Sequence, residues 1–136
     1  MHMKGEPATM QQEPHYDDVV REVKTFLKER VAAVEAAGIG RERLLVDPGF
    51  GFGKTATHNL TLLKNLKALD MGVPLLAGLS RKSTLGRITG RPADERLAGS
   101  LAMALLALQG GARILRVHDV KETKDVVAVW EAVRST

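Results

Sequence analysis

Residues 44–55 read LLVDPGFGFGKT, and this stretch decides the fold. Three apolar residues followed by Asp47-Pro48 are typical of a short strand buried on both faces of a sheet. Three alternating glycines then form a loop, and leucines at helical spacing follow soon after it. A strand, a glycine loop and a helix in this order indicate a βα unit of a parallel sheet.

The same alternation continues along the chain. Strands are expected at 73–79 and 113–117, so that successive strands lie about thirty to forty residues apart. Apolar residues at helical spacing predict helices at 16–37, 60–69, 93–109 and 122–134. The sequence therefore predicts an α/β fold with a parallel sheet.

Composition narrows the class of protein. The chain has 136 residues, of which 44% are hydrophobic and 26% charged, and a net charge of +4; this suits one globular domain and excludes a low-complexity chain. The basic residues are scattered, so we expect a small anionic ligand and no nucleic-acid partner. The longest apolar stretch, 97–108, is too short to span a membrane. With no secretory signal and no cysteine, the expected location is the cytoplasm.

Polar residues gather where the predicted strands end. Asp47 follows the first strand, the SRKS segment at 80–83 follows the second, and Arg116 and His118 close the third. Both open α/β sheets and (β/α)8 barrels bind their ligands at the carboxyl ends of the strands. We therefore expect one ligand site at this edge of the sheet.

The glycine loop ends in Gly-Lys-Thr, as a phosphate-binding P-loop does, but Pro48 stands where that pattern needs a glycine. A buried carboxylate at Asp47 needs hydrogen-bond donors, which suits the two N–H groups of an aminopyrimidinone ring. The glycines would let the backbone approach a flat ligand, with Phe50 and Phe52 projecting as apolar walls. The alternative is a tight turn that binds nothing.

The two later segments carry cations. Two cations and two hydroxyls at 80–83 suit a carboxylate or a phosphate, and the alternative is a solvated basic turn with Ser83 as a helix N-cap. Strand alternation would bring Arg116 and His118 to one side, where they could hold an anion together, while Asp119 would cap the last helix. The four histidines lie in different predicted elements, so no metal site is expected.

DPGFGFGK at 47–54, SRKS at 80–83 and RVHD at 116–119 occur in this order at three strand ends. Together with the opening MHMKGEP, they resemble the dihydropteroate synthase family over essentially all 136 residues. The resemblance implies a (β/α)8 TIM barrel and a transferase of folate biosynthesis. Such an enzyme joins 6-hydroxymethyl-7,8-dihydropterin pyrophosphate to p-aminobenzoate and releases pyrophosphate, and sulfonamides compete for the aminobenzoate site.

The resemblance implies a pterin site made of five residues. Asp47 resembles the aspartate that accepts hydrogen bonds from the pterin ring N–H and the exocyclic amine, and Lys82 the lysine that reaches the pterin carbonyl and ring nitrogen. Arg116 is similar to the arginine that stacks on the pterin face. Phe52 and Met1 complete the expected pterin site, Met1 at a position where the family has an apolar residue under the ring.

A p-aminobenzoate site is implied beside the pterin. Ser83 would hold the aminobenzoate carboxylate, Lys82 would lie beside the molecule, and Phe52 with Gly51 would form the wall. These roles follow from the resemblance and make p-aminobenzoate the second expected small-molecule partner.

Lys82, Arg116 and His118 are the residues expected to be catalytic. In the family the C–O bond to pyrophosphate breaks early, and the aminobenzoate amine then attacks the pterin cation. Arg116 and His118 would hold the departing pyrophosphate. The contribution of the protein to such a route is to position the reactants and to stabilise the leaving charge.

Residues 1–136 are expected to form the second half of a pterin-binding barrel, from the end of strand 5 through helix 8, because eight βα units need about 250 residues. Three strands would leave two open sheet edges. The resemblance implies Mg²⁺ with its protein ligand in the first half and no metal ligand in this half, so we expect the chain alone to be inactive. The last helices make the dimer contact of the family and predict a homodimer.

Two alternatives remain open. The chain could be a non-catalytic half-barrel with a structural or assembly role, which would release no pyrophosphate from the two substrates. It could also be a related pterin-binding methyltransferase domain. The SRKS segment counts against the methyltransferase, because that reaction has no use for an aminobenzoate-carboxylate site.

Overall fold

The computed structural model describes residues 1–136 and has an α/β fold that is mostly helical. Two short parallel strands, β1 (Leu76–Ala77) and β2 (Ile114–Leu115), pair with Leu76 opposite Ile114. Val46 adds a parallel bridge to Leu75 on the other side of β1. The three predicted strands are therefore neighbours in chain order, which confirms the parallel arrangement.

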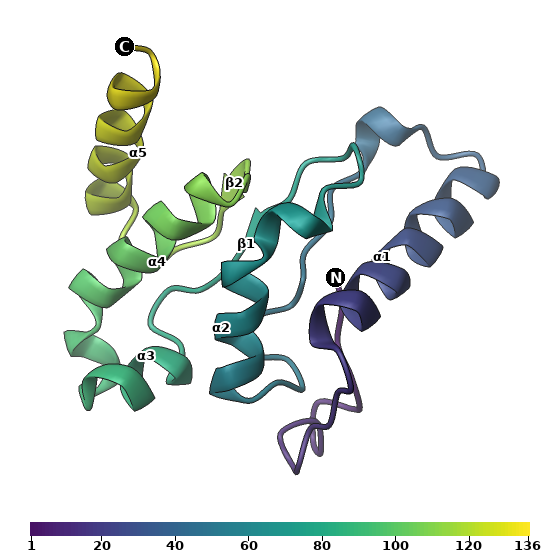
Figure 1. Ribbon diagram of the computed structural model, residues 1–136, viewed down its shortest axis with the longest axis horizontal. Coiled ribbons are helices and arrows are strands. Elements are labelled where there is room, and N and C mark those ends of the chain that lie inside the picture. The colour runs from purple at the N-terminus through teal and green to yellow at the C-terminus, as the bar shows by residue number, and fades with distance from the viewer.

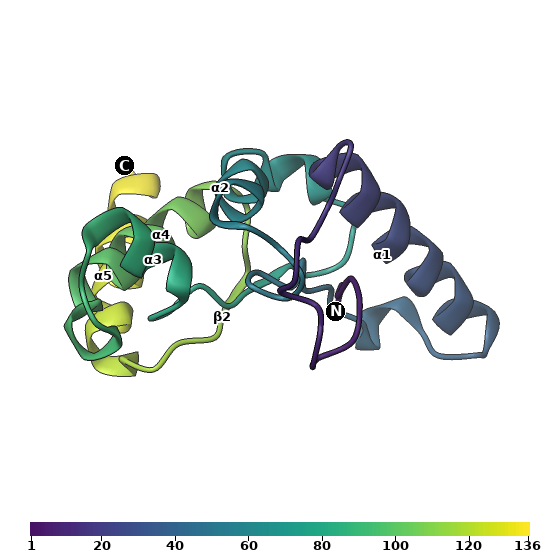
Figure 2. The ribbon, with the colours of Figure 1, turned by 90° about the horizontal axis from the view of Figure 1, so that it is seen from below.

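The helices surround these strands, and Figures 1 and 2 show an elongated molecule with α1 at one end and α5 at the other. Helix α1 packs against α2, and α4 packs against both α3 and α5. The α-helices are α1 (Val19–Ala36), α2 (Ala56–Lys64), α3 (Ser83–Thr89), α4 (Leu97–Gln109) and α5 (Val120–Arg134). Three 3₁₀ turns join them: η1 (Arg41–Arg43), η2 (Leu66–Leu69) and η3 (Ala93–Glu95).

Helix α1 begins three residues later than its apolar pattern predicts, because its start is fixed by hydrogen bonds. The Asp18 carboxylate accepts from the Arg21 backbone N–H at 3.0 Å, as an N-cap does. In return, the Glu22 carboxylate accepts from the backbone N–H groups of Asp17 and Asp18. One first-turn donor and the two N–H groups before the helix are thus satisfied by side chains of the same segment.

The single helix predicted at 60–69 is divided in the structure. Helix α2 starts earlier, at Ala56, because Thr55 and His58 form a reciprocal capping box. It ends at Lys64, where the Asn65 side-chain amide donates to the Thr61 carbonyl at 2.9 Å, and η2 follows. Leu63, Leu66 and Leu69 are buried on both sides of the break, whereas Leu60 is 40% exposed.

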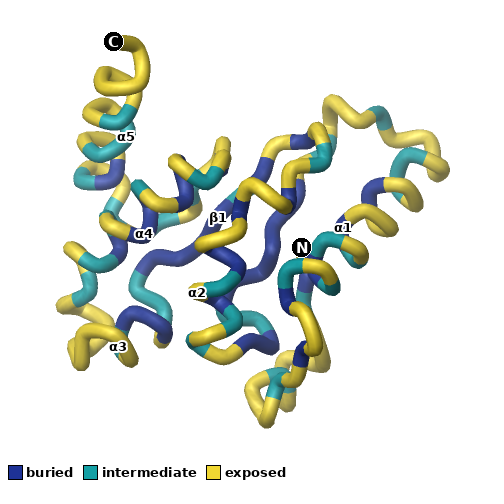
Figure 3. Tube along the Cα trace, in the orientation of Figure 1, coloured by how far each residue is buried: buried dark blue, intermediate teal, exposed yellow.

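The core lies around the strands and between α1 and α2, where Figure 3 shows the buried segments gathered. Its largest fully buried side chains are Phe50, Leu27, Leu62, Leu66, Leu69 and Val23. This core brings α1, the glycine loop and α2 together, so the loop that follows Val46 is anchored on a packed base.

The expectation that the first strand is buried on both faces is wrong for Leu45. Val46 is buried, but the Leu45 side chain is 48% exposed. Val46 pairs only with the segment on its β1 side, so no element of this chain covers Leu45.

None of the helices is both long enough and apolar enough to cross a bilayer.

Candidate active site

Asp47 and Arg116 meet at the carboxyl ends of the two strand segments that flank β1. Arg116 Nη2 lies 3.4 Å from Asp47 Oδ2, and the other carboxylate oxygen, Oδ1, accepts from the Gly49 backbone N–H at 2.7 Å. The carboxylate is buried, whereas the Arg116 side chain is 54% exposed. The buried Asp47 carboxylate thus faces the Gly49 backbone N–H and the Arg116 guanidinium, which is open to solvent.

Arg116 reaches this position across Gly78. A Cβ atom at residue 78 would lie 2.8 Å from Arg116 Nη2, closer than real Cβ contacts allow. The absence of a side chain at Gly78 therefore gives the guanidinium a flat backbone surface on which to lie. Sequence reasoning missed this glycine, because its role depends on contact with Arg116, which lies much further along the chain.

Lys82 lies against the glycine loop. Its Nζ is 4.8 Å from the centroid of the Phe52 ring and donates to the Phe50 carbonyl. Its stem passes within 3.3 Å of the place where a Cβ on Gly51 would stand. Burial, and after it the nearby Arg116 cation, lower the pKa of Lys82 to about 8 against the opposing effect of Asp47.

Only one of the two phenylalanines forms a wall of the site. Phe52 is partly buried under Lys82, but Phe50 is 1% exposed and belongs to the hydrophobic core. The expectation of two apolar walls is therefore wrong for Phe50. The positive φ of Gly51, 81°, turns the chain between the two phenylalanines and separates their rings, and the Phe50 ring is taken up by the core.

His118 turns toward the second strand end. Its Nδ1 lies 2.9 Å from Ser80 Oγ, and its backbone N–H donates to the same oxygen at 3.3 Å. Ser80 is buried and so fixes the orientation of the imidazole. The expectation that His118 and Arg116 hold an anion together stays a prediction.

Arg81 points away from the site. Its φ of 55° is in the left-handed region, which an arginine seldom adopts. The Arg81 backbone N–H donates to Ser100 Oγ at 2.9 Å, and Arg96 Nη1 donates to the Arg81 carbonyl at 2.9 Å. The turn therefore sends Arg81 to Asp119 and leaves Lys82 facing the glycine loop.

Two capping expectations are wrong. The Asp119 carboxylate does not cap α5: it accepts from Arg81 Nε at 3.1 Å, and the hydrogen bond from Arg81 lowers the pKa of Asp119. Ser83 is not an N-cap either, because Lys82 occupies that position and makes no side-chain cap bond. The Ser83 side chain is exposed at the start of α3, where its hydroxyl is free to meet a ligand.

The N-terminal segment lies along the glycine loop. The His2 backbone N–H donates to the Asp47 carbonyl at 2.9 Å. A Cβ on Gly49, whose φ is +69°, would lie 1.8 Å from the His2 carbonyl oxygen and 3.5 Å from Met1 Cγ. Met1 thus lies beside the glycine loop and is 54% exposed, and its expected pterin contact stays a prediction.

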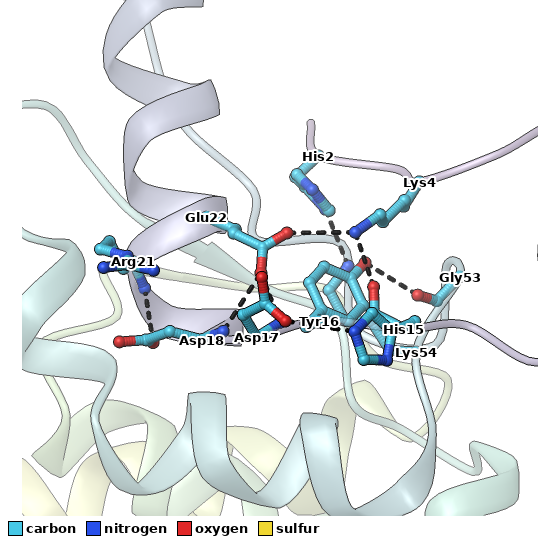
Figure 4. A network of polar contacts seen from close by, with 10 residues as sticks. All are labelled: His2, Lys4, His15, Tyr16, Asp17, Asp18, Arg21, Glu22, Gly53 and Lys54. Carbon is cyan, nitrogen blue, oxygen red and sulfur yellow. Dashed lines mark hydrogen bonds and ion pairs between the residues drawn. The ribbon is translucent and has the colours of Figure 1, made fainter.

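Lys54 and His2 form a buried pair that sequence reasoning missed. Lys54 Nζ donates to the carbonyls of Gly49 and Phe52 at 2.8 and 3.0 Å and lies 2.9 Å from His2 Nδ1, as Figure 4 shows for the pair. Burial lowers the pKa of Lys54 to about 7 and that of His2 to about 4. One signal was available, since a lysine after the glycine run that has no P-loop phosphate to bind needs other acceptors.

No three His, Asp or Glu side chains of residues 1–136 are grouped closely enough to hold a metal ion. Asp47 and Asp119 are each paired with an arginine. The place where the Mg²⁺ implied by the resemblance would bind stays a prediction.

Comparison with known proteins decides the family. The model of the pterin binding enzymes matches residues 1–118. The chain belongs to the pterin-binding enzyme family. Within it, the dihydropteroate synthase of Escherichia coli is 52% identical over 136 residues, which cover 99% of this chain and 48% of that protein.

Solved structures of pterin-binding enzymes agree with this result. The Yersinia pestis dihydropteroate synthase in a sulfonamide drug complex superposes with a TM-score of 0.96 at 46% identity, covering 98% of this chain and 49% of that one. The Xanthomonas albilineans dihydropteroate synthase in complex with 7,8-dihydropteroate gives a TM-score of 0.90 at 55% identity, covering 99% and 49%. The chain thus spans about half the length of the relatives it matches.

Proposed function

We propose that residues 1–136 supply the pterin-binding half of a dihydropteroate synthase, which joins 6-hydroxymethyl-7,8-dihydropterin pyrophosphate to p-aminobenzoate. One observation carries the proposal: the buried Asp47 carboxylate lies 3.4 Å from the half-exposed Arg116 guanidinium, and Lys82 lies nearby against the glycine loop. An acceptor and two donors at one edge of the sheet match the edge of a pterin ring, which has both kinds of group. Membership of the pterin-binding enzyme family supports the same ligand.

In the proposed complex, Asp47 accepts from the pterin ring N–H and the exocyclic amine. Lys82 donates to the pterin carbonyl and ring nitrogen, and Arg116, which lies flat over Gly78, stacks on the ring. Phe52 and Met1 supply apolar contacts. Arg116 would give up its contact with Asp47 when the pterin arrives, because the ring N–H groups then satisfy the carboxylate.

The reaction then needs a leaving group and a nucleophile at the pterin methylene carbon. The C–O bond breaks first, with its electron pair going to pyrophosphate, whose charge Arg116 and His118 stabilise. The aminobenzoate amine then forms the new C–N bond to the pterin cation and loses one proton, which passes to the pyrophosphate or to water. Ser83 holds the aminobenzoate carboxylate, while Lys82, Phe52 and Gly51 line its ring. The Ser80 hydrogen bond to His118 supports this role by fixing the imidazole.

The same proposal covers architecture and assembly. We propose that residues 1–136 are one unit, the second half of a (β/α)8 barrel, because the parallel order of Val46, β1 and β2 and the exposed Leu45 suit a sheet that continues beyond this chain. The remaining part would hold Mg²⁺, so we expect the chain alone to be inactive. The exposed Val129 and Val133 of α5 support a homodimer through the last helices. A chain without cysteine suits the proposed cytoplasmic location.

A chimaera tests the function. Residues 1–136 would replace the matching segment of the Escherichia coli dihydropteroate synthase, and pyrophosphate release would be measured with both substrates and with each one omitted. We expect release that depends on both substrates. A folded chimaera that releases pyrophosphate no faster than buffer would refute the proposal and favour a non-catalytic half-barrel.

The pterin contact has its own variant. Asp47→Asn in the chimaera keeps the size of the side chain but removes the charge, so the pterin dissociation constant should rise by roughly 100-fold, as loss of a charged hydrogen-bond pair costs about 1.5–3 kcal/mol. Asp17→Asn, at a carboxylate that is 84% exposed, is the matched control and should change nothing. Equal pterin affinity in both variants would remove Asp47 from the site.

A further inference from the structure

Lys54 is the most deeply buried cation of the chain, with 3% of its surface exposed. It lies after the last glycine of the loop, outside the group of side chains to which the proposed function gives a role. A lysine in such a place has a high desolvation cost, so its retention needs partners that offset this cost. The partners of Lys54 are therefore informative about what it does.

All three contacts of Lys54 Nζ go to segments that border the ligand site. The carbonyls of Gly49 and Phe52, 2.8 and 3.0 Å from Nζ, lie on the two sides of the turn that carries Gly51. His2 Nδ1, at 2.9 Å, belongs to the N-terminal segment that carries Met1. One amine thus closes the glycine loop on itself and joins it to a second segment.

A second set of contacts holds the outer end of the same loop. The Tyr16 hydroxyl donates to the Gly53 carbonyl at 2.8 Å, and the Tyr16 ring lies under Lys4 Nζ at 4.3 Å from its centroid (Figure 4). The His2 ring packs edge-on against Phe26 of α1, with centroids 5.0 Å apart. The loop is therefore joined to α1 through side chains that lie behind it rather than in the site.

The part of the loop that faces the site is held by a few single hydrogen bonds. The Gly51 N–H donates to Asn59 Oδ1 at 2.9 Å, and the Gly51 carbonyl accepts from the Gln11 side-chain amide. The Phe52 N–H donates to the Gly49 carbonyl at 3.1 Å, and the Phe50 carbonyl accepts from Lys82. If the carbonyls of Gly49 and Phe52 were released, the glycines would give this turn many conformations. Lys82 and Phe52 would then lose their fixed relation.

We propose that Lys54 is a positioning residue: its hydrogen bonds to the Gly49 and Phe52 carbonyls and its contact with His2 hold the glycine loop and the Met1 segment in the shape that the pterin and p-aminobenzoate sites need. The proposal rests on the proposed function for its ligands. The geometry of the loop does not depend on that function and can be tested separately.

The first test compares Lys54→Met with Lys64→Met. Methionine keeps most of the apolar volume of the lysine stem and removes the donors, while Lys64 is an exposed lysine at the end of α2 and serves as the matched control. In the 136-residue chain, amide hydrogen exchange at Gly51 and Phe52 should become about tenfold faster in Lys54→Met, with exchange at the core residues Leu62 and Leu66 unchanged. Equal loop exchange in Lys54→Met and the unmutated chain would overturn the proposal.

The second measurement links the loop to the ligands. In the chimaera, Lys54→Met should raise the KM for both substrates about tenfold with a smaller change in kcat, because binding walls are displaced while reacting groups remain. Unchanged KM values together with faster loop exchange would also overturn the proposal. If the unmutated chimaera binds neither substrate, the proposed function fails, and the exchange data alone decide whether Lys54 fixes the loop.

A pair of variants at His2 keeps the test decisive if Lys54→Met does not fold. His2→Asn retains an acceptor near the position of Nδ1, whereas His2→Leu removes it. Loop exchange should be close to that of the unmutated chain in His2→Asn and faster in His2→Leu. The same exchange rates in the two variants would show that the Lys54 contact does not fix the Met1 segment.

Discussion

The glycine loop and the two later strand ends both bring cations to the site, but they use them in opposite ways. Lys54 is 3% exposed and makes all its contacts within the chain. Arg116 is 54% exposed and makes one ion pair, at 3.4 Å. The first region uses its cation to hold the backbone in shape, and the second leaves its cation open to a ligand.

The two regions should therefore respond differently to substitution. Where polar groups are satisfied inside the fold, a change should lower the free energy of unfolding. Where the polar groups face solvent, a change should alter ligand affinity and leave stability nearly as it was. Three predictions, in order of decreasing expected effect, test this division between supporting and ligand-facing residues.

Gly49→Ala should have the largest effect. The added Cβ would lie 1.8 Å from the His2 carbonyl oxygen, and the backbone φ of +69° is unfavourable for alanine. We expect the free energy of unfolding to fall by about 4 kcal/mol. Gly38→Ala is the matched control, because its φ is also positive but nothing lies within 4 Å of its Cβ; about 1 kcal/mol is expected there. Urea denaturation checks both, and similar losses would show that the loop is not tightly packed.

His2 should make stability depend on pH. Burial, followed by the charge of Lys54, lowers the pKa of His2 from 6.5 to about 4, so the folded chain favours the neutral ring. The stabilisation is complete above pH 6.5 and is lost as the pH falls toward 4, by roughly 2–3 kcal/mol. His2→Asn lacks this titration and retains Lys54, so the contribution of Lys54 cancels in the comparison. Denaturation of the two chains at several pH values should give curves that converge in acid, and parallel curves would contradict the assignment.

Arg116→Gln should have the smallest effect on stability. Its guanidinium is half exposed, so the loss of the pair with Asp47 should change the free energy of unfolding by less than about 1 kcal/mol. Arg87→Gln, at an exposed arginine of α3, is the control. Pterin affinity in the chimaera should fall in Arg116→Gln only. A loss of several kcal/mol in stability would mean that Arg116 belongs to the supporting region, and the division of the site would be wrong.

Sequence patterns predicted the parts of the fold that depend on local order. The alternation of strands and helices and the polar residues after each strand follow from spacing along the chain, and the structure brings Asp47, Lys82 and Arg116 together accordingly. The direction of side chains within loops could not be predicted in this way. Phe50 and Phe52 differ by two positions, yet one lies in the core and the other in the site.

The other missed features depend on contacts between distant residues. The positive φ of Arg81 is held by Ser100 and Arg96, which lie in and before α4. Gly78 matters because Arg116 crosses it. His2 and Lys54 are fifty-two positions apart and meet only after α1 and the loop have packed. No local pattern includes such pairs, so their roles needed the folded chain.

The contact between Lys54 and His2 also sets how the loop responds to pH. Loss of the Lys54 proton leaves its contacts in place, whereas protonation of His2 opposes them. With a pKa of about 7, Lys54 changes between ammonium and amine in the neutral range. An amine can still donate to the two carbonyls and can accept from a neutral His2 ring that carries its proton on Nδ1, so deprotonation breaks no contact. A second proton on His2, in contrast, would set two cations 2.9 Å apart. These contacts should therefore survive loss of the Lys54 proton and be broken when His2 gains one.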